Sequence, residues 1–191
     1  MKNIFSKAQK QVDKRTKSIT YNKDSKNRII VNMVVENDNE FLSPFSESNS
    51  PIISEQVATF IENSTDSIKQ NEKLSLHIKH NNITVEKQEK YRKAISEYYT
   101  QKYIKTNLEY RRNNIIVASL TLLGILVLTL QLLFDYIISN SILSEVINIF
   151  AWVLLWEAVD VGFFKNHKIK LKQNRYLSYI DMDITFTQVL N

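Results

Sequence analysis

The chain has 191 residues, a formal net charge of +5 and no cysteine. The lack of cysteine excludes a disulfide framework and a thiolate metal site, and the three histidines are scattered along the chain. Glycine occurs only at positions 124 and 162, so a glycine-rich loop that cradles phosphate cannot be built. The P-loop, dinucleotide-binding, zinc-protease and serine-hydrolase motifs are missing too. We therefore expect a protein that is not an enzyme and that holds no cofactor or metal.

The N-terminal part begins with a polar, lysine-rich segment, residues 1–27. We interpret it as a solvated tail, with an arm that touches anionic lipid or nucleic acid as the alternative. Residues 28–36 are a β-branched run and residues 73–79 alternate apolar and polar side chains, so both are predicted strands. Between them, a loop at residues 41–51 leads into an amphipathic helix that fades by residue 68.

Residues 85–112 contain no glycine or proline and many helix formers. They predict one helix that runs into the apolar segment without a break. Its residues Tyr91, Tyr98 and Tyr99 form a stripe, which we interpret as a core or subunit contact. A base-stacking surface, as in proteins that bind single-stranded nucleic acid, is the alternative.

The C-terminal residues 180–186 alternate strictly and predict a third strand. This strand can pair with either of the other two, so residues 28–84 and 176–191 are expected to form one small α+β domain. His77 and His80 lie at the end of the second strand and in the turn after it, with no acidic partner nearby in sequence. We expect both at the surface.

Two long apolar runs dominate the second half of the chain. Residues 115–134 are twenty residues without a charge, and residues 142–164 are nearly as apolar but carry three acidic side chains. A helix of about twenty apolar residues spans the roughly 30 Å hydrocarbon core of a bilayer. Residues 113–164 are therefore predicted to form a hairpin of two transmembrane helices.

The topology follows from the basic residues. Lysines and arginines precede the first apolar run and follow the second, whereas residues 135–141 contain none. By the positive-inside rule both termini are cytoplasmic. The predicted fold class is thus a membrane α-helical hairpin with a small cytosolic α+β domain. Residues 85–112 would be the long connecting helix and residues 165–175 a basic juxtamembrane segment.

Polar and small residues recur every three or four positions along the first run and share one helix face. Lipid offers amides and carboxylates no partner, so this face should meet another helix or line an aqueous path. The second run adds Glu157 and Asp160, which the nearby Arg111, Arg112 or Lys165 can neutralise. In a cyclic homo-oligomer they would instead form acidic rings at a pore mouth. We favour this interpretation. The predicted pore-lining residues are Thr121, Gly124, Leu128, Gln131, Asp135, Glu157 and Asp160.

The same assembly would gather basic residues beneath the pore. A converging basic ring attracts anionic lipid head groups, or a nucleotide or oligonucleotide. Lipid is the commoner explanation for basic residues at a membrane edge. The predicted ligand- or lipid-binding residues are Lys105, Arg111, Arg112, Lys165, Lys168 and Lys170.

The two-span architecture, with Trp-Glu-Ala-Val-Asp at residues 156–160 and Phe-Phe-Lys at residues 163–165, resembles that of short bacterial membrane proteins. These are transmembrane effectors of anti-phage defence, such as the Hailong-type channel that is paired with a nucleotidyltransferase. The resemblance covers most of the chain, and Glu157 and Asp160 are its matching motif positions. It implies a channel in the bacterial inner membrane, gated from the cytosol by a nucleotide-derived ligand such as a DNA oligomer. It also implies that opening depolarises the cell.

The leading hypothesis is therefore an oligomeric ion channel whose cytosolic domain senses a ligand or partner. The alternative is a non-conducting, membrane-anchored scaffold or adaptor with a cytosolic interaction domain. The two differ in what they predict for the purified protein, because the adaptor would pass no ions and would be a monomer or dimer in detergent.

Overall fold

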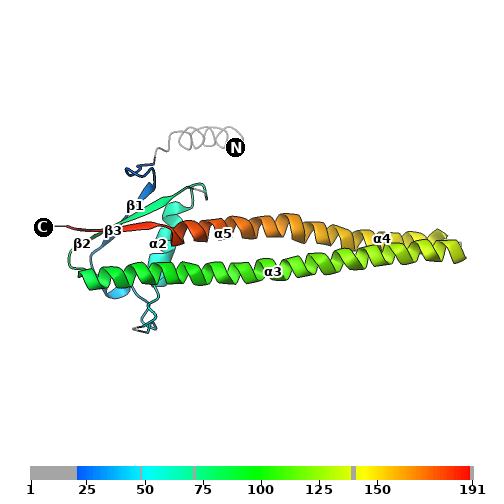
Figure 1. The fold of residues 1–191 in the computed structure, drawn as a ribbon, viewed down its shortest axis with the longest axis horizontal. Coiled ribbons are helices and arrows are strands. Elements are labelled where there is room, and N and C mark those ends of the chain that lie inside the picture. Colours follow the sequence, from blue (N-terminus) through cyan, green and yellow to red (C-terminus); the bar gives the residue numbers. More distant parts are fainter. Residues whose placement is uncertain (1–20, 48, 71, 139–140, 190–191) are drawn as a thin grey trace, which may run out of the picture.

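The computed structural model describes residues 21–47, 49–70, 72–138 and 141–189. Residues 1–20 of the predicted polar tail lie outside the described residues, as does the side chain of Asp135. A small domain with a three-stranded sheet occupies one end of the molecule, and a long helical hairpin extends from it (Figure 1).

The three strands are those that the sequence predicts. They are β1 (Ile29–Val35), β2 (Leu74–His80) and β3 (Asp183–Gln188). The boundary of β3 differs from the prediction, because the preceding helix continues through Ile180 and the strand starts only at Asp183. The runs of β-branched and alternating residues were therefore sufficient to locate all three strands.

The sheet is parallel, with β2 in the centre between β1 and β3. Parallel neighbours need crossover connections. Helix α2 (Glu55–Thr65) lies in the crossover from β1 to β2, and the entire helical hairpin forms the crossover from β2 to β3. Ser54 caps α2 by accepting a hydrogen bond from the backbone N–H of Val57 at 3.4 Å. The sheet domain is thus of the α/β kind, which corrects the expected α+β class.

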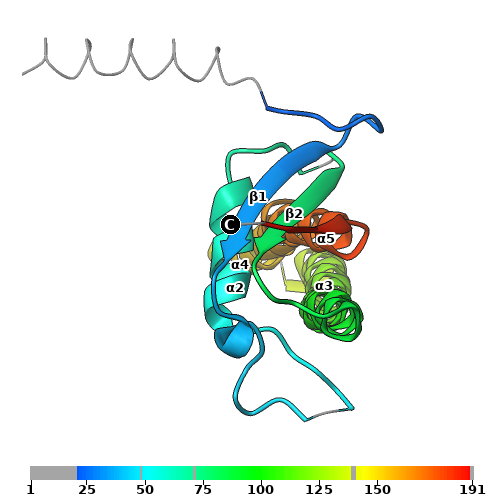
Figure 2. The same ribbon diagram turned by 90° about the vertical axis from the view of Figure 1, so that its left-hand side faces the viewer.

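One face of the sheet packs against helices and the other is open. In Figure 2 the sheet domain lies in front, and the helices of the hairpin recede behind it. On the open face the aligned residues Asn32, His77 and Thr185 are exposed or half-buried. The core combines the other strand face with side chains from the helices, including Val31, Leu76, Ile184, Ala58, Ile61, Ala94, Ile95 and Tyr179.

The structure tests the predictions made for the tyrosine stripe and for His80. Tyr91 and Tyr99 have 3% and 0% of their surface exposed, so they are core residues and not a base-stacking surface. His80 is 4% exposed, and its Nδ1 accepts a hydrogen bond from the backbone N–H of Ile83 at 3.0 Å. The expectation that His80 lies at the surface is wrong, because β2 extends to this residue and turns it toward the core face.

The hairpin begins with α3 (Val85–Ile138), an unbroken helix of 54 residues, as predicted. At a rise of 1.5 Å per residue it is about 80 Å long. The returning limb consists of α4 (Ser141–Val159), the π-helix η2 (Asp160–Lys165) and α5 (Asn166–Ile180). This limb lies alongside α3 over its whole length (Figure 1).

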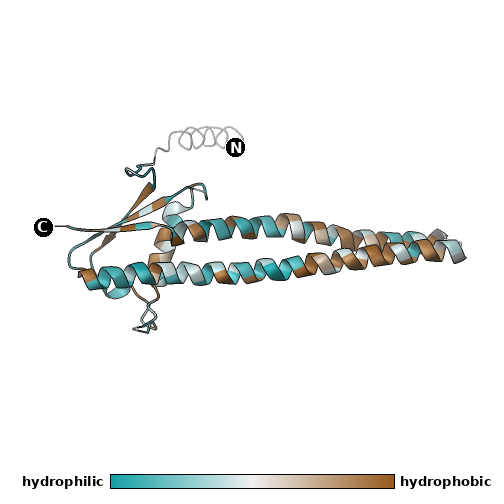
Figure 3. Cartoon of the chain, in the orientation of Figure 1, coloured by the Kyte–Doolittle hydropathy of each residue, from teal (hydrophilic) through white to brown (hydrophobic). Residues whose placement is uncertain are grey.

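Figure 3 shows that most residues in the far part of the hairpin are apolar, in brown. We call residues 115–134 and 142–164 the apolar hairpin. Both limbs belong to helices that are long and apolar enough to cross a membrane. Many large side chains point outward, for example Leu122 and Phe163, each 74% exposed. A continuous exposed apolar surface of this kind marks contact with lipid or with other protein.

The part of the hairpin next to the sheet domain, residues 85–114 and 165–180, is called the stalk. Polar groups join its two helices. Asn166 donates to Asn114 at 2.7 Å and Gln173 donates to Asn107 at 3.4 Å. Hydrogen bonds between side-chain amides therefore join the two helices within the stalk.

Candidate functional site

An acid–base cluster lies where α4 gives way to α5. Lys165 Nζ is 3.1 Å from Glu157 Oε1 and 3.1 Å from Asp160 Oδ2. Residues 160–165 form a π-helix, in which backbone hydrogen bonds join residues five positions apart. This geometry brings the side chains of Asp160 and Lys165 onto one side of the helix. Two carboxylates and one ammonium group leave this cluster with a net charge of −1.

The cluster lies on the outer side of the hairpin. Its side chains are 52%, 40% and 52% exposed for Glu157, Asp160 and Lys165. In contrast, Ala158 and Val161 on the same stretch are each 5% exposed. In a single chain, then, Lys165 pairs with both acids, and all three point away from the interior of the hairpin.

The predicted pore-lining residues of the first apolar run lie on a different face. A Cβ built on Gly124 would be 2.8 Å from Leu155 Cδ2, so Gly124 is a point of close contact between α3 and α4. Thr121, Leu128 and Gln131 are half-buried on the same side. Within one chain this side forms the helix–helix seam, one of the two interpretations of the polar face. The predicted pore lining is therefore divided between the seam and the outer surface.

The predicted basic residues are all exposed, but they have different surroundings. Lys165 belongs to the acid–base cluster, and Lys170 lies over the ring of Tyr110 at 5.5 Å. Lys168 lines a cleft beside the stalk. The remaining members lie on the surface of α3: Lys105, Arg111 and Arg112.

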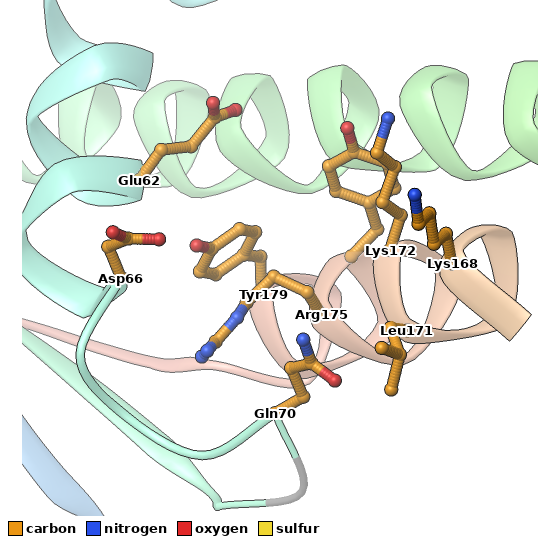
Figure 4. A pocket seen from close by; sticks show the side chains of 9 residues that line it. Glu62, Asp66, Gln70, Lys168, Leu171, Lys172, Arg175 and Tyr179 are labelled. Carbon is orange, nitrogen blue, oxygen red and sulfur yellow. The ribbon is translucent and has the colours of Figure 1, made fainter.

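The cleft beside the stalk has a volume of about 490 Å³ and lies between α2 and α5 (Figure 4). Glu62 of α2 and Asp66, the residue directly after this helix, form one side. The other side is basic, with residues that lie on α5: Lys168, Lys172 and Arg175. The lining is completed by Gln70, Leu171, Tyr176 and Tyr179. A cleft of this size is in the range of sites for small molecules.

Two contacts hold α5 against α2 at the base of the cleft. Arg175 Nη2 donates to the carbonyl oxygen of Ile68. The hydroxyl groups of Tyr179 and Thr65 are 2.6 Å apart in a buried hydrogen bond. Burial raises the pKa of Tyr179 and that of Tyr176, so both phenols are neutral at physiological pH. The cleft therefore has a hydrogen-bonded base and neutral tyrosine side chains between its acidic and basic sides.

Two charged side chains of the cleft are incompletely paired. Glu62 Oε1 and Arg175 Nη1 are buried and have no hydrogen-bond partner among the described residues. Such atoms are rare in native proteins because leaving them unpaired is unfavourable. Sequence reasoning named only Lys168 of this cleft. The basic side of the cleft could have been identified from the i, i+4, i+7 spacing of Lys168, Lys172 and Arg175, which places these residues on one helix face.

The cluster and the cleft lie on one continuous limb, because η2 passes directly into α5. Chemically, the cluster is an outward-facing group of charges with excess negative charge. The cleft can accept a small molecule between basic and acidic walls. Comparison of the chain with family models, with curated proteins and with solved structures finds no significant match.

Proposed function

We propose that the apolar hairpin crosses a membrane twice and that copies of the chain assemble around a path that conducts ions. The length of the two helices and their exposed apolar surfaces support the crossing. The basic residues of the stalk, set against their absence from residues 135–141, favour cytoplasmic termini and a cytoplasmic sheet domain. A bacterial inner membrane is the proposed location.

The observation that carries the proposal is the outward orientation of the acid–base cluster. A single hairpin in lipid would direct Glu157 and Asp160 toward hydrocarbon or head groups, where charge is unfavourable. Assembly with other copies gives these groups protein or water to face. Two helices cannot enclose a hydrated path, so a cyclic homo-oligomer is the simplest arrangement. Its ring of clusters, each with a net charge of −1, would favour cations over anions.

A membrane-anchored scaffold or adaptor that does not conduct is the second candidate. The pairing of Lys165 with both acids favours the adaptor, because the acidic groups are partly neutralised within one chain and do not require water or a second copy of the chain. The position of Gly124 in the seam between α3 and α4 favours it too, since that face is already occupied within one chain.

Ion flux from proteoliposomes separates the two candidates. The channel should release K⁺ in preference to Cl⁻. Neutralising both acids, with Glu157→Gln and Asp160→Asn, should weaken that preference, whereas Lys165→Gln should strengthen it. Lys93→Gln, at an exposed position of α3 outside the apolar hairpin, is the control with a matched change of charge.

One outcome would contradict the acidic ring and another the channel itself. Wild-type conductance and selectivity in the double variant would remove the acidic residues from the conduction path. A complete lack of flux, together with a monomer or dimer by native mass measurement in detergent, would favour the adaptor.

We further propose that the sheet domain senses a nucleotide or oligonucleotide made by a partner nucleotidyltransferase, in anti-phage defence. This part rests on the resemblance of residues 156–165 to two-span defence effectors. Cells that carry the chain with its partner enzyme should lose membrane potential after phage infection. Cells with the Glu157→Gln and Asp160→Asn variant should keep it. An equal loss of potential in both would argue against this role.

A further inference from the structure

We infer that the cleft between α2 and α5 binds a soluble phosphate ester that also carries hydrogen-bond donors, the class of nucleotides and sugar phosphates. The inference deepens the proposed function, on which it rests for the placement of the cleft in the cytosol. It follows from the charges of the two walls, from the two unpaired buried atoms and from the distance between the cleft and the apolar hairpin.

The basic wall is suited to a phosphate group. Lys168, Lys172 and Arg175 share one face of α5, at i, i+4 and i+7. Arg175 is already oriented, because its Nη2 donates to the carbonyl of Ile68 while Nη1 remains buried and unpaired. A guanidinium group held in this way can direct its free N–H groups at an anionic oxygen. Two flexible lysines complete the charge of the wall.

The acidic wall restricts the ligand further. A carboxylate accepts hydrogen bonds and donates none, so the buried Glu62 Oε1 requires a donor. Asp66, four residues further at the C-terminal end of α2, adds a second negative charge. A bare anion would satisfy Arg175 and be repelled by these two groups. A phosphate ester with hydroxyl or amino groups satisfies both walls, with its phosphate on α5 and its donors on α2.

The position of the cleft argues against a lipid head group as the source of the phosphate. Arg175 lies ten residues beyond Lys165, which is about 15 Å along a helix, whereas Lys168, at the near end of the cleft, is only about 4.5 Å beyond it. The head-group layer on one side of a bilayer is only about 5–8 Å thick. The half-buried Tyr176 also lines the cleft and offers a surface on which a ring of the ligand can pack. A soluble ligand therefore fits better than a membrane lipid.

Binding in this cleft would bridge the sheet domain and the hairpin. Glu62 and Asp66 belong to the crossover between β1 and β2, whereas the basic wall belongs to α5. Because α5 continues directly into η2, a ligand that fastens α5 to α2 acts on the helix that carries Asp160 and Lys165. The cleft is thus a place from which a cytosolic ligand can bias the acid–base cluster.

Calorimetric titration of the full chain in detergent micelles tests the inference. The probes are adenosine monophosphate and ribose 5-phosphate, with inorganic phosphate and uncharged ribose for comparison. The two esters should bind, and each should bind more tightly than phosphate or ribose alone. Lys172→Gln should weaken ester binding about tenfold, as expected for the loss of one charged hydrogen bond. Glu62→Gln should reduce the advantage of the esters over inorganic phosphate, and Lys93→Gln should change nothing.

Several results would overturn the inference. Lack of binding of either ester to protein that melts normally would do so, and so would equal affinity for esters and inorganic phosphate. Ester binding that survives both Lys172→Gln and Glu62→Gln would place the site elsewhere. Competition by micelle-embedded phosphatidylglycerol would identify a lipid site. Flux without ester binding would overturn this inference alone, whereas ester binding without flux would support it and contradict the proposed channel.

Discussion

The buried hydrogen bond between Tyr179 and Thr65 allows a quantitative test of how α5 is fastened to the sheet domain. Tyr179 is 3% exposed and Thr65 is 0% exposed. Thr65 donates its own proton to the carbonyl of Ile61 at 2.8 Å, so at 2.6 Å the Tyr179 hydroxyl is the donor to Thr65. The two substitutions therefore differ, because only Thr65→Val leaves a buried hydroxyl group without a partner.

The expected free energies follow from that assignment. Tyr179→Phe removes one hydrogen bond and leaves Thr65 bonded to Ile61, at a loss of about 1 kcal/mol. Thr65→Val keeps the shape but leaves the phenol buried and unpaired, at a loss of about 1–3 kcal/mol. The double variant leaves no unpaired hydroxyl, so its loss should be smaller than the sum of the two by about 1 kcal/mol.

The assay is urea unfolding of the three variants and the wild type in detergent micelles, followed by near-ultraviolet circular dichroism. The loss in free energy of unfolding should be larger for Thr65→Val than for Tyr179→Phe. Additive losses would mean that the two hydroxyl groups are not coupled. A larger loss for Tyr179→Phe would mean that the direction of the hydrogen bond has been assigned incorrectly.

Two further predictions concern the sheet domain and the apolar hairpin. The hydrogen bond from Lys87 holds the pKa of Asp38 below its usual range. The ionised carboxylate of Asp38 therefore stabilises the folded state fully above pH about 4, and this stabilisation is lost as the pH falls through the lowered pKa. Asp38→Asn should lower the free energy of unfolding at pH 7 by up to about 1 kcal/mol. Its melting temperature should also fall less than that of the wild type between pH 7 and pH 3. An equal fall for the two proteins would contradict this prediction. Gly124→Ala should be less stable than Gly162→Ala by about 1–3 kcal/mol, because its Cβ would lie 2.8 Å from Leu155 while both variants gain helix propensity. Gly162→Ala is the matched control, since its nearest contact would be 3.4 Å away, and equal melting temperatures for the two variants would refute the close contact.

The elements themselves were largely determined by local sequence. The alternation of Leu74, Leu76 and Ile78 with polar residues predicts β2, and the structure has that strand with those three side chains in the core. The lack of glycine and proline in residues 85–112 predicts the unbroken start of α3. These predictions succeed because backbone propensity and the burial of one face act over a few neighbouring residues.

Which faces meet was decided by the tertiary structure. The pattern of the strands is the same for parallel and antiparallel pairing at this length, so the parallel order and the role of the hairpin as a crossover were not predictable from it. The burial of His80 depends on β2 continuing one residue further than the alternation indicates.

The cleft depends on tertiary structure, whereas the acid–base cluster depends on the local π-helix. Thr65 and Tyr179 are 114 positions apart, and only the packing of α5 on α2 forms the cleft between them. Lys165 was one of three possible partners for the acids until the π-helix brought it beside Asp160. The physical reason is that periodicity records which side of a helix or strand avoids water. The choice of partner comes from many weak contacts between residues far apart in the chain, and these leave no local pattern.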